Sequence, residues 1–201
     1  MRDIEEILDK GICCIIPIYK TGIGNSTKLI IDDGTVIIDK RMVKTILSII
    51  AKYYTIHIQA CRAKYGKMLH QRLCVPIFIH NKLLLIPFKM RKPKFPKDGA
   101  HGYINFYSIE EIKETNKYTI VRLKNGIEVT CLHRMRTVLQ HINKAKLIER
   151  EAYANGRYDE QKFHEFYIQY NSPATKGDIA RLQKEILELR EILKKMIKKE
   201  T

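Results

Sequence analysis

Short apolar runs separated by turn sequences fill most of residues 12–131 and predict a series of β-strands. The first run, ICCIIPI at residues 12–18, contains Pro17. It predicts an edge strand, because proline has no N–H to donate to a neighbouring strand. Hairpins are predicted where a polar tip separates two apolar runs: at Asp33-Gly34, His80-Asn81-Lys82 and Asn125-Gly126.

Two longer segments place apolar residues at helical spacing instead. Residues 40–56 have one apolar face, formed by Val43, Ile46, Leu47, Ile50 and Tyr54, and a second face that carries Lys40, Lys44 and Lys52. The basic stretch that follows is expected to break at Gly66. Residues 133–156 predict a helix that ends at Gly156, with an apolar side of Met135, Val138, Leu139, Ile142, Leu147 and Ile148.

The end of the chain has a heptad pattern. Residues 171–177 read as a linker, and the helix predicted over residues 178–201 repeats apolar residues at alternating spacings of three and four: Ile179, Leu182, Ile186, Leu189, Leu193 and Met196. This seam predicts self-association as a dimer or a higher oligomer. Ile192 and Ile197 widen the apolar face, so packing of the helix on its own domain stays open as an alternative.

Together these patterns predict an α+β fold. It has a mixed, mainly antiparallel sheet built from hairpins, packed helices, and a C-terminal coiled-coil-like helix. The predicted domains are residues 1–170, the linker at 171–177 and the helix at 178–201. A short aromatic helix at residues 159–170 closes the first domain.

The distribution of charge indicates what kind of partner the protein binds, which the apolar pattern does not. The chain has 37 Lys and Arg against 22 Asp and Glu, and its net charge is +15. Between Lys40 and Ala100 there are 14 basic residues and a single acid, Asp98. Solubility does not require that acids be excluded over such a length, whereas a surface that binds a polyanion does. Nucleic acid is the expected partner, with an anionic membrane surface as the alternative.

The sequence has no motif typical of catalysis, metal binding or a phosphate-binding loop. The five cysteines show no CxxC pair, the seven histidines are scattered without HExxH, and no paired carboxylates suggest acid–base work. Gly22 and Gly24 lack the spacing of a phosphate-binding loop and precede a predicted hairpin. We therefore expect no enzyme, no metal and no cofactor. The absence of an apolar run of about 18 residues, and of a signal peptide, predicts a cytoplasmic protein without a membrane span.

A series of short motifs resembles the competence transcription factor (ComK-like) family of low-GC Gram-positive bacteria, over roughly Ile12 to Ile148. The segment ACRAKYGK at residues 60–67 is similar to the family's Ser-Ser-Tyr-x-Gly-Arg stretch, with Lys67 in place of the Arg. VPIFI and LLLIPF resemble its Pro-Ile strand and Phe-Pro turn, and Tyr103 of GYI replaces the tryptophan of a Trp-Ile pair. LKNGIEV and Leu139-Gln140 follow in family order.

The resemblance implies a transcriptional activator of competence-type genes that binds AT-rich double-stranded DNA through the minor groove as a dimer or larger assembly. RNA polymerase is a further implied partner, and a nucleoid location follows. An inserted Arg suits a narrow minor groove, so Arg62, Arg72 and Arg91 are the candidates for insertion. The expected phosphate contacts are Lys64, Lys67, Lys82, Lys89, Lys92, Lys94 and Lys97. Pro93 and Pro96 stiffen the basic loop within residues 87–109.

Three alternatives stay open. A LytTR-type DNA-binding domain shares the strand, Asn-Gly turn, strand and helix seen over residues 117–142. An RNA-binding protein could stack bases on Tyr103, Phe106 and Tyr107, although alternation along a strand favours the core for these side chains. A basic protein tethered to the nucleoid or a membrane, without an activator role, is the third.

Overall fold

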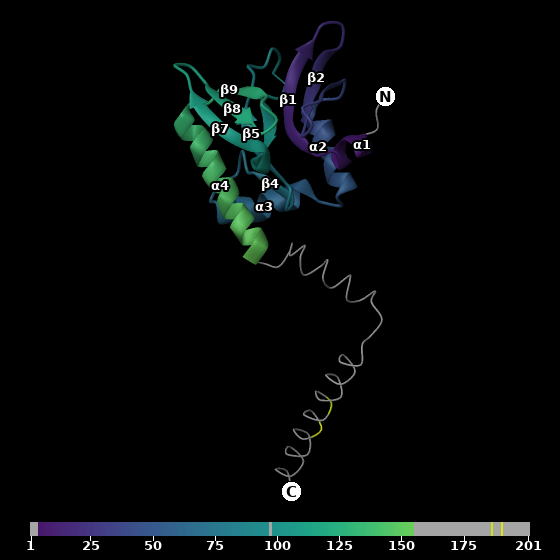
Figure 1. The fold of residues 1–201 in the computed structure, drawn as a ribbon, viewed down its shortest axis with the longest axis vertical. Helices are drawn as coiled ribbons and strands as arrows, with labels where there is room; N and C mark the ends of the chain where they lie inside the picture. Colours follow the sequence, from purple (N-terminus) through teal and green to yellow (C-terminus); the bar gives the residue numbers. More distant parts are fainter. Residues whose placement is uncertain (1–3, 97, 155–185, 187–189, 191–201) are drawn as a thin grey trace. The chain divides into compact units, whose positions relative to one another are not determined.

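The structure of this chain is a computed structural model that describes residues 4–96, 98–154, 186 and 190 (Figure 1). Contacts divide the chain into one compact unit from Met1 to Tyr158 and a second from Asp159 to Thr201. In the second unit the described residues are Ile186 and Arg190, and both are helical. The aromatic helix at 159–170, the linker at 171–177 and the other seam residues lie outside the described residues, so self-association stays a prediction: Ile179, Leu182, Leu189, Leu193 and Met196.

The first unit contains two antiparallel sheets and four helices among its described residues. The six-stranded sheet has the spatial order β3 (Val36–Asp39), β2 (Gly24–Ile31), β1 (Ile12–Lys20), β6 (His101–Asn105), β5 (Leu83–Lys89) and β4 (Ile77–His80). The three-stranded sheet consists of β7 (Ile109–Glu114), β8 (Thr119–Leu123) and β9 (Glu128–Cys131). The helices are α1 (Ile4–Asp9), α2 (Val43–Tyr53), α3 (Ile58–Met68) and α4 (Met135–Ala154), with a 3-10 turn η1 (Phe106–Ser108). The predicted α+β class with a mainly antiparallel sheet is confirmed for this unit.

The six-stranded sheet separates two apolar cores, because both of its faces are covered (Figure 1). One core lies under α1 and α2 and takes Leu83 and Leu85 from β5. The other lies under α4 and the three-stranded sheet and takes Leu84, Ile86 and Phe88 from the same strand. The alternation of side chains along a strand therefore sends successive residues of β5 into different cores.

The three predicted hairpins are confirmed as β2–β3, β4–β5 and β8–β9. The expectation of an edge strand at residues 12–18 is wrong, because β1 lies between β2 and β6. Pro17 is tolerated there since β6 pairs with β1 only at Cys14 and Ile15, so no ladder partner stands beside Pro17 on that side. On the other side of β1, Pro17 stands opposite Thr27 of β2.

Two details of the helices also differ from the sequence expectation. Gly66 does not break α3; the loop after the helix folds back so closely that a Cβ at Gly66 would lie 2.6 Å from the carbonyl oxygen of Gln71. On α4, Leu139 and Leu147 are exposed. The buried side of α4 keeps three of the expected apolar residues and adds His141 and two alanines: Val138, His141, Ile142, Ala145, Ile148 and Ala152.

Gly102 on β6 offers a test of this packing. A Cβ at Gly102 would stand 2.5 Å from the carbonyl oxygen of Ile15 and 2.9 Å from Cδ of Pro17, and backbone atoms cannot move aside cheaply. Gly102→Ala is therefore expected to lower the free energy of unfolding by about 1–3 kcal/mol. At Gly99 nothing lies within 4 Å of an added Cβ. Gly99→Ala is the matched control and should change stability by less than about 0.5 kcal/mol in urea unfolding.

Candidate nucleic-acid interface

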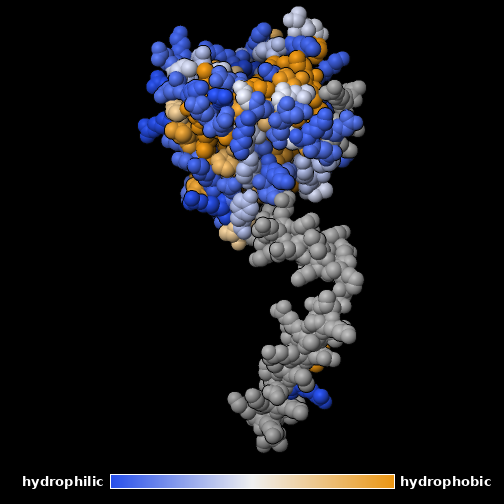
Figure 2. All heavy atoms as spheres, viewed as in Figure 1, coloured by the Kyte–Doolittle hydropathy of each residue, from blue (hydrophilic) through white to orange (hydrophobic). Residues whose placement is uncertain are grey.

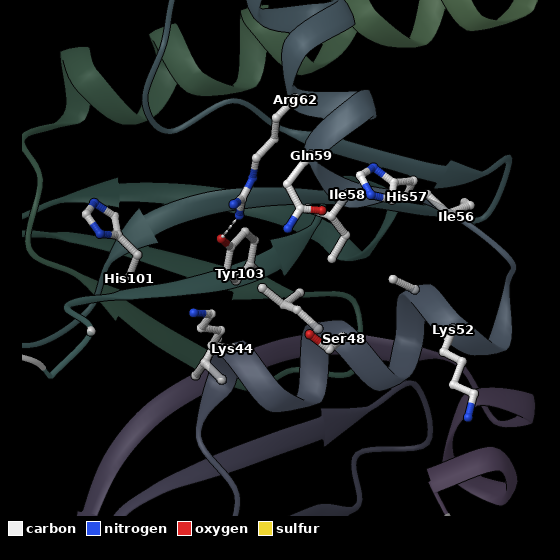
Figure 3. A pocket seen from close by; sticks show the side chains of 14 residues that line it. Lys44, Ser48, Lys52, Ile56, His57, Ile58, Gln59, Arg62, His101 and Tyr103 are labelled. Atoms are coloured by element: carbon white, nitrogen blue, oxygen red, sulfur yellow. Dashed lines mark hydrogen bonds between the residues drawn. The ribbon is translucent and has the colours of Figure 1, made fainter.

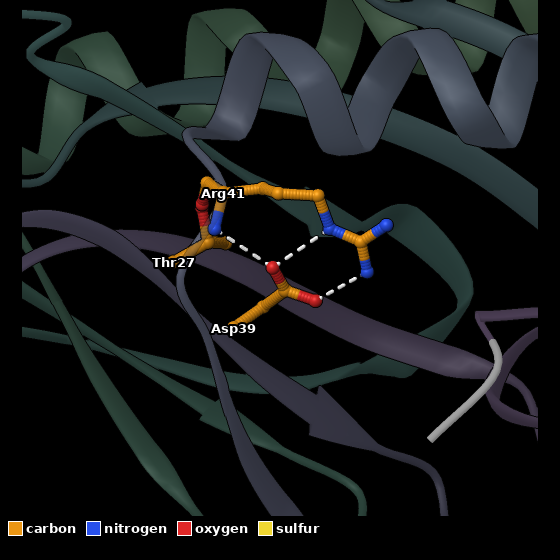
Figure 4. A network of polar contacts seen from close by, with 3 residues as sticks. All are labelled: Thr27, Asp39 and Arg41. Carbon is orange, nitrogen blue, oxygen red and sulfur yellow. Dashed lines mark hydrogen bonds and ion pairs between the residues drawn. The ribbon is translucent and has the colours of Figure 1, made fainter. Parts of the chain in front are cut away.

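The start of α2 is fixed by a polar network around Asp39 (Figure 4). Its Oδ1 accepts hydrogen bonds from the backbone N–H of Arg41 at 2.8 Å and from Nε at 2.9 Å, and its Oδ2 accepts one from Nη2 at 2.6 Å. The Thr27 hydroxyl donates to the carbonyl oxygen of Arg41 at 2.6 Å. The hydrogen bonds from Arg41 hold the pKa of Asp39 below its usual value. These contacts tie the chain before α2 to β2 and β3, and so set the direction in which Lys44 and Lys52 project.

A hollow of about 480 Å³ lies between α2 and α3 (Figure 3). Its cationic side chains are Lys44 and Lys52 from α2 and Arg62 from α3, and no Asp or Glu is among the described residues that line it. Arg62 reaches across to Tyr103 and donates a hydrogen bond from Nη2 to the hydroxyl at 2.9 Å (Figure 3). Burial raises the pKa of Tyr103, so this hydroxyl remains neutral beside the guanidinium at neutral pH.

A second hollow, of about 500 Å³, shares Arg62 with the first. It is lined by Lys67 and Arg72 as well, again without an acid among its described lining residues. The loop that carries Arg72 has left-handed backbone at both ends, with φ of 49° at His70 and 54° at Cys74. Non-glycine residues adopt this region at a cost, so the surrounding contacts must impose it. The two hollows therefore place five cations along α2, α3 and this loop.

The basic loop after β5 is fastened at its base by Arg91. The guanidinium donates to the carbonyl oxygens of Ile18 at 2.9 Å and Gly99 at 2.8 Å, and to Oδ1 of Asn25 at 2.7 Å. It also lies over the ring of Tyr19, 4.2 Å from the centroid. Arg91 is thus engaged with β1, β2 and its own loop, and its predicted insertion into DNA stays a prediction.

Asp98, the single acid of residues 40–100, belongs to the same fastening. Its carboxylate accepts hydrogen bonds from the hydroxyl of Tyr19 and from Nδ2 of Asn25, the latter at 3.0 Å. The Tyr19 hydroxyl in turn accepts the backbone N–H of Lys94 at 2.8 Å. The negative charge is therefore held against β1 and β2, while Lys92 and Lys94 are exposed.

The structure brings some of the predicted site residues together and separates others. Arg62, Lys67 and Arg72 line the second hollow, and Arg62 also lines the first. The loop after β5 borders the first hollow, because Gly99 lines it beside His101 of β6. Lys64 is exposed on α3, beside the ring of Tyr65. Lys89 is half-buried on β5, opposite His101 of β6. Lys92 and Lys94 lie on the loop after β5. Lys82 lies apart, in a hollow that Asp9 and Asp32 also line. Lys97 lies outside the described residues.

Lys44 and Lys52 were not among the predicted contacts. Their position on the polar face of the predicted helix over residues 40–56, inside the acid-free segment, was the signal that could have identified them. What the sequence did not show is that this face borders Arg62, since that requires α3 to pack beside α2.

Three histidines form a group that begins at His101, which lines the first hollow, and continues through His133 to His141 on α4. The ring centroid of His133 lies 6.5 Å from that of His101 and 5.3 Å from that of His141. Nδ1 of His141 is 2.8 Å from the carbonyl oxygen of Pro87, and Nε2 of His101 is 3.4 Å from Sγ of Cys74. In the described part of the chain, no three His, Cys, Asp or Glu side chains form a group suited to a metal ion.

No family model, curated protein or solved structure matches this chain. None of the helices in residues 4–96 and 98–154 is long and apolar enough to cross a bilayer. On the face drawn in Figure 2, hydrophilic side chains cover most of the first unit, and hydrophobic ones reach the surface in separate patches.

Acid should destabilise the protein through the histidine group. Burial, followed by the positive neighbours His141, His101 and Lys89, lowers the pKa of His133 from 6.5 to about 4. Between these values the unfolded chain binds a proton that the folded protein excludes, so the free energy of unfolding falls as the pH is lowered through this window.

Urea unfolding at a series of pH values from 7.5 to about 4 measures this dependence. His133→Asn should make it less steep, because the substituted side chain does not titrate; His101 and His141, whose pKa burial also lowers, keep the remainder. His70→Asn, at an exposed position whose left-handed backbone suits Asn, is the matched control and should keep the wild-type dependence. Equal slopes for wild type and His133→Asn would contradict the assignment.

Proposed function

We propose that this protein is a double-stranded DNA-binding transcriptional activator that recognises AT-rich sites through the minor groove. The observation that carries the proposal is the cationic surface on α2, α3 and the loop after β5, where the described residues that line the two hollows include no Asp or Glu. Five cations line the two hollows without a described Asp or Glu, and the carboxylate of Asp98 is turned toward Tyr19 and Asn25.

Such a surface suits the phosphate backbone of a duplex. Each phosphate that a Lys or Arg neutralises releases condensed counterions, and this release supplies much of the affinity of proteins for DNA. An acid within the contact area would oppose it by repulsion and by the cost of desolvation. Under this proposal the scarcity of acids over residues 40–100, where Asp98 is the single one, is a functional requirement, whereas a merely solvated surface would have tolerated more.

Recognition by groove shape fits the side chains on this surface. The exposed Arg62 and Arg72 lie among lysines, and Arg enters a narrow, strongly negative minor groove more readily than Lys because its guanidinium is less strongly hydrated. Activation of transcription, dimer formation and the control of competence-type genes rest on the resemblance to the competence transcription factor family, and belong to the proposal on that ground.

Base stacking on the aromatic residues of β6 and η1 is a weaker basis for function. Tyr103 is only 7% exposed, and Phe106 and Tyr107 pack against the core under α4. A single-stranded RNA ligand would need such rings at the surface. Alternation along a strand was expected to bury about half of these side chains; Tyr103 is buried, and Phe106 and Tyr107 are partly buried, so little ring surface is left for base stacking.

Salt titration of duplex binding gives the main test. If about six to eight phosphates are neutralised, the logarithm of the affinity should fall with the logarithm of the salt concentration with a slope of about −5 to −7. Lys67→Ala combined with Arg72→Ala should weaken binding and reduce the steepness of this slope by about two, since two phosphate contacts are removed.

The control removes the same charge elsewhere. Lys113→Ala combined with Lys124→Ala changes two exposed lysines of the three-stranded sheet and should leave the slope near the wild-type value. Fluorescence anisotropy with a labelled AT-rich duplex measures both variants. Affinity that does not depend on salt, or tighter binding of single-stranded RNA at equal salt, would overturn the proposal. A minor-groove dye should compete with the protein on the same duplex.

A further inference from the structure

Phe95 is the one aromatic residue in the sequence of the loop after β5, and its side chain is 66% exposed. Single apolar side chains on a surface are common and need no explanation by themselves. Phe95 differs in its setting, because it lies in the sequence Lys92-Pro93-Lys94-Phe95-Pro96-Lys97, within a segment whose single acid, Asp98, is held by Tyr19 and Asn25. Its neighbours are therefore lysines, which attract phosphates, and prolines, which limit the freedom of the loop.

The base of this loop holds Phe95 in place without burying it. Arg91 is fastened to Ile18, Asn25 and Gly99, and the backbone N–H of Lys94 donates to the hydroxyl of Tyr19. On the other side of Phe95, the backbone N–H of Asp98 donates to its carbonyl oxygen at 3.0 Å. A loop ordered in advance loses less conformational entropy on binding than a flexible one. The fastening thus lowers the cost of presenting Phe95 to a ligand.

Under the proposed minor-groove binding, a duplex would bury this side chain in that groove. Lys92 and Lys94, which precede Phe95 and are exposed, would contact the phosphates beside the groove. Apolar side chains that enter the minor groove insert between base pairs, partly unstack them and bend the duplex. We propose that Phe95 is such a wedge, inserted between stacked base pairs from the minor groove; this inference rests on the proposed function.

The wedge would add sequence preference without a hydrogen bond to any base. Pyrimidine–purine steps such as TA are easily unstacked, whereas A-tracts are stiff. Insertion of Phe95 therefore costs less at a TA step. Two AT-rich duplexes of equal composition, one with a central TA step and one with an A-tract, should bind with different affinity, and the difference should depend on Phe95.

The experiment uses the full chain and duplexes that carry 2-aminopurine at the central step, whose fluorescence rises when the base is unstacked. Wild type should raise the fluorescence of the TA duplex. Phe95→Ala should abolish the rise and bind this duplex about tenfold more weakly, with an unchanged salt slope, because no phosphate contact is lost. Leu147→Ala, at a residue 50% exposed on α4, is the matched control and should behave as wild type.

Arg91→Lys tests whether the fastened loop matters. Lysine keeps the charge but cannot make the three hydrogen bonds of the guanidinium, so the fluorescence rise should shrink while the salt slope stays unchanged.

If wild type binds no duplex, the proposed function fails. If it binds with the expected slope but Phe95→Ala gives the same fluorescence rise and the same preference for the TA step, only the wedge is overturned. Vesicles with anionic headgroups that bind wild type tightly and Phe95→Ala weakly, with no effect of the variant on DNA, would also overturn it.

Discussion

The burial of β5 on both faces is the constraint on which the arrangement of the first unit depends. Every side chain from Leu83 to Phe88 is buried, with alternate residues in the two cores. A strand in this position has no face for a charged group, since burying an unpaired charge costs far more than the apolar contacts gain. The cations of the two hollows and of the loop after β5 therefore lie outside this strand, on α2, on α3 and on the loops.

The loop after β5 shows how charge is sorted within that surface. Arg91 and Asp98 lie at its base, where their groups contact β1 and β2, and the lysines and Phe95 lie farther out. Arg91 makes its contacts through three hydrogen bonds and a stacked ring, which a planar guanidinium provides and an ammonium does not. Arg91 and Asp98 thus serve the conformation of the loop, and Lys94 contributes through its backbone N–H and through its ammonium, which lies 4.9 Å from the centroid of the Tyr19 ring.

Local features of the fold were predictable because their causes are local. The hairpin at Asn125-Gly126 follows from a dipeptide that accepts the required turn, and Gly126 has the positive φ of 82° that such a turn uses. The position of β1 was not predictable from Pro17, because β6 arrives from some 85 residues away and happens to stop pairing before the proline. Gly66 looked like a break for another reason: the chain turns back directly after α3, and the backbone of Gln71 packs against Gly66, where only a residue without a Cβ fits.

The α+β class, the hairpins and the scarcity of acids in residues 40–100 follow from the sequence alone, because they depend on residue type and on short-range pattern. Only the tertiary structure decided which cations share a surface. It placed Lys44 and Lys52 beside Arg62, joined Arg62 to Lys67 and Arg72, and left Lys82 among the acids Asp9 and Asp32. It also decided that Asp98 is held by Tyr19 and Asn25. The physical reason is that such neighbours are set by the packing of helices and loops against strands that are distant in sequence, and no local pattern records those contacts.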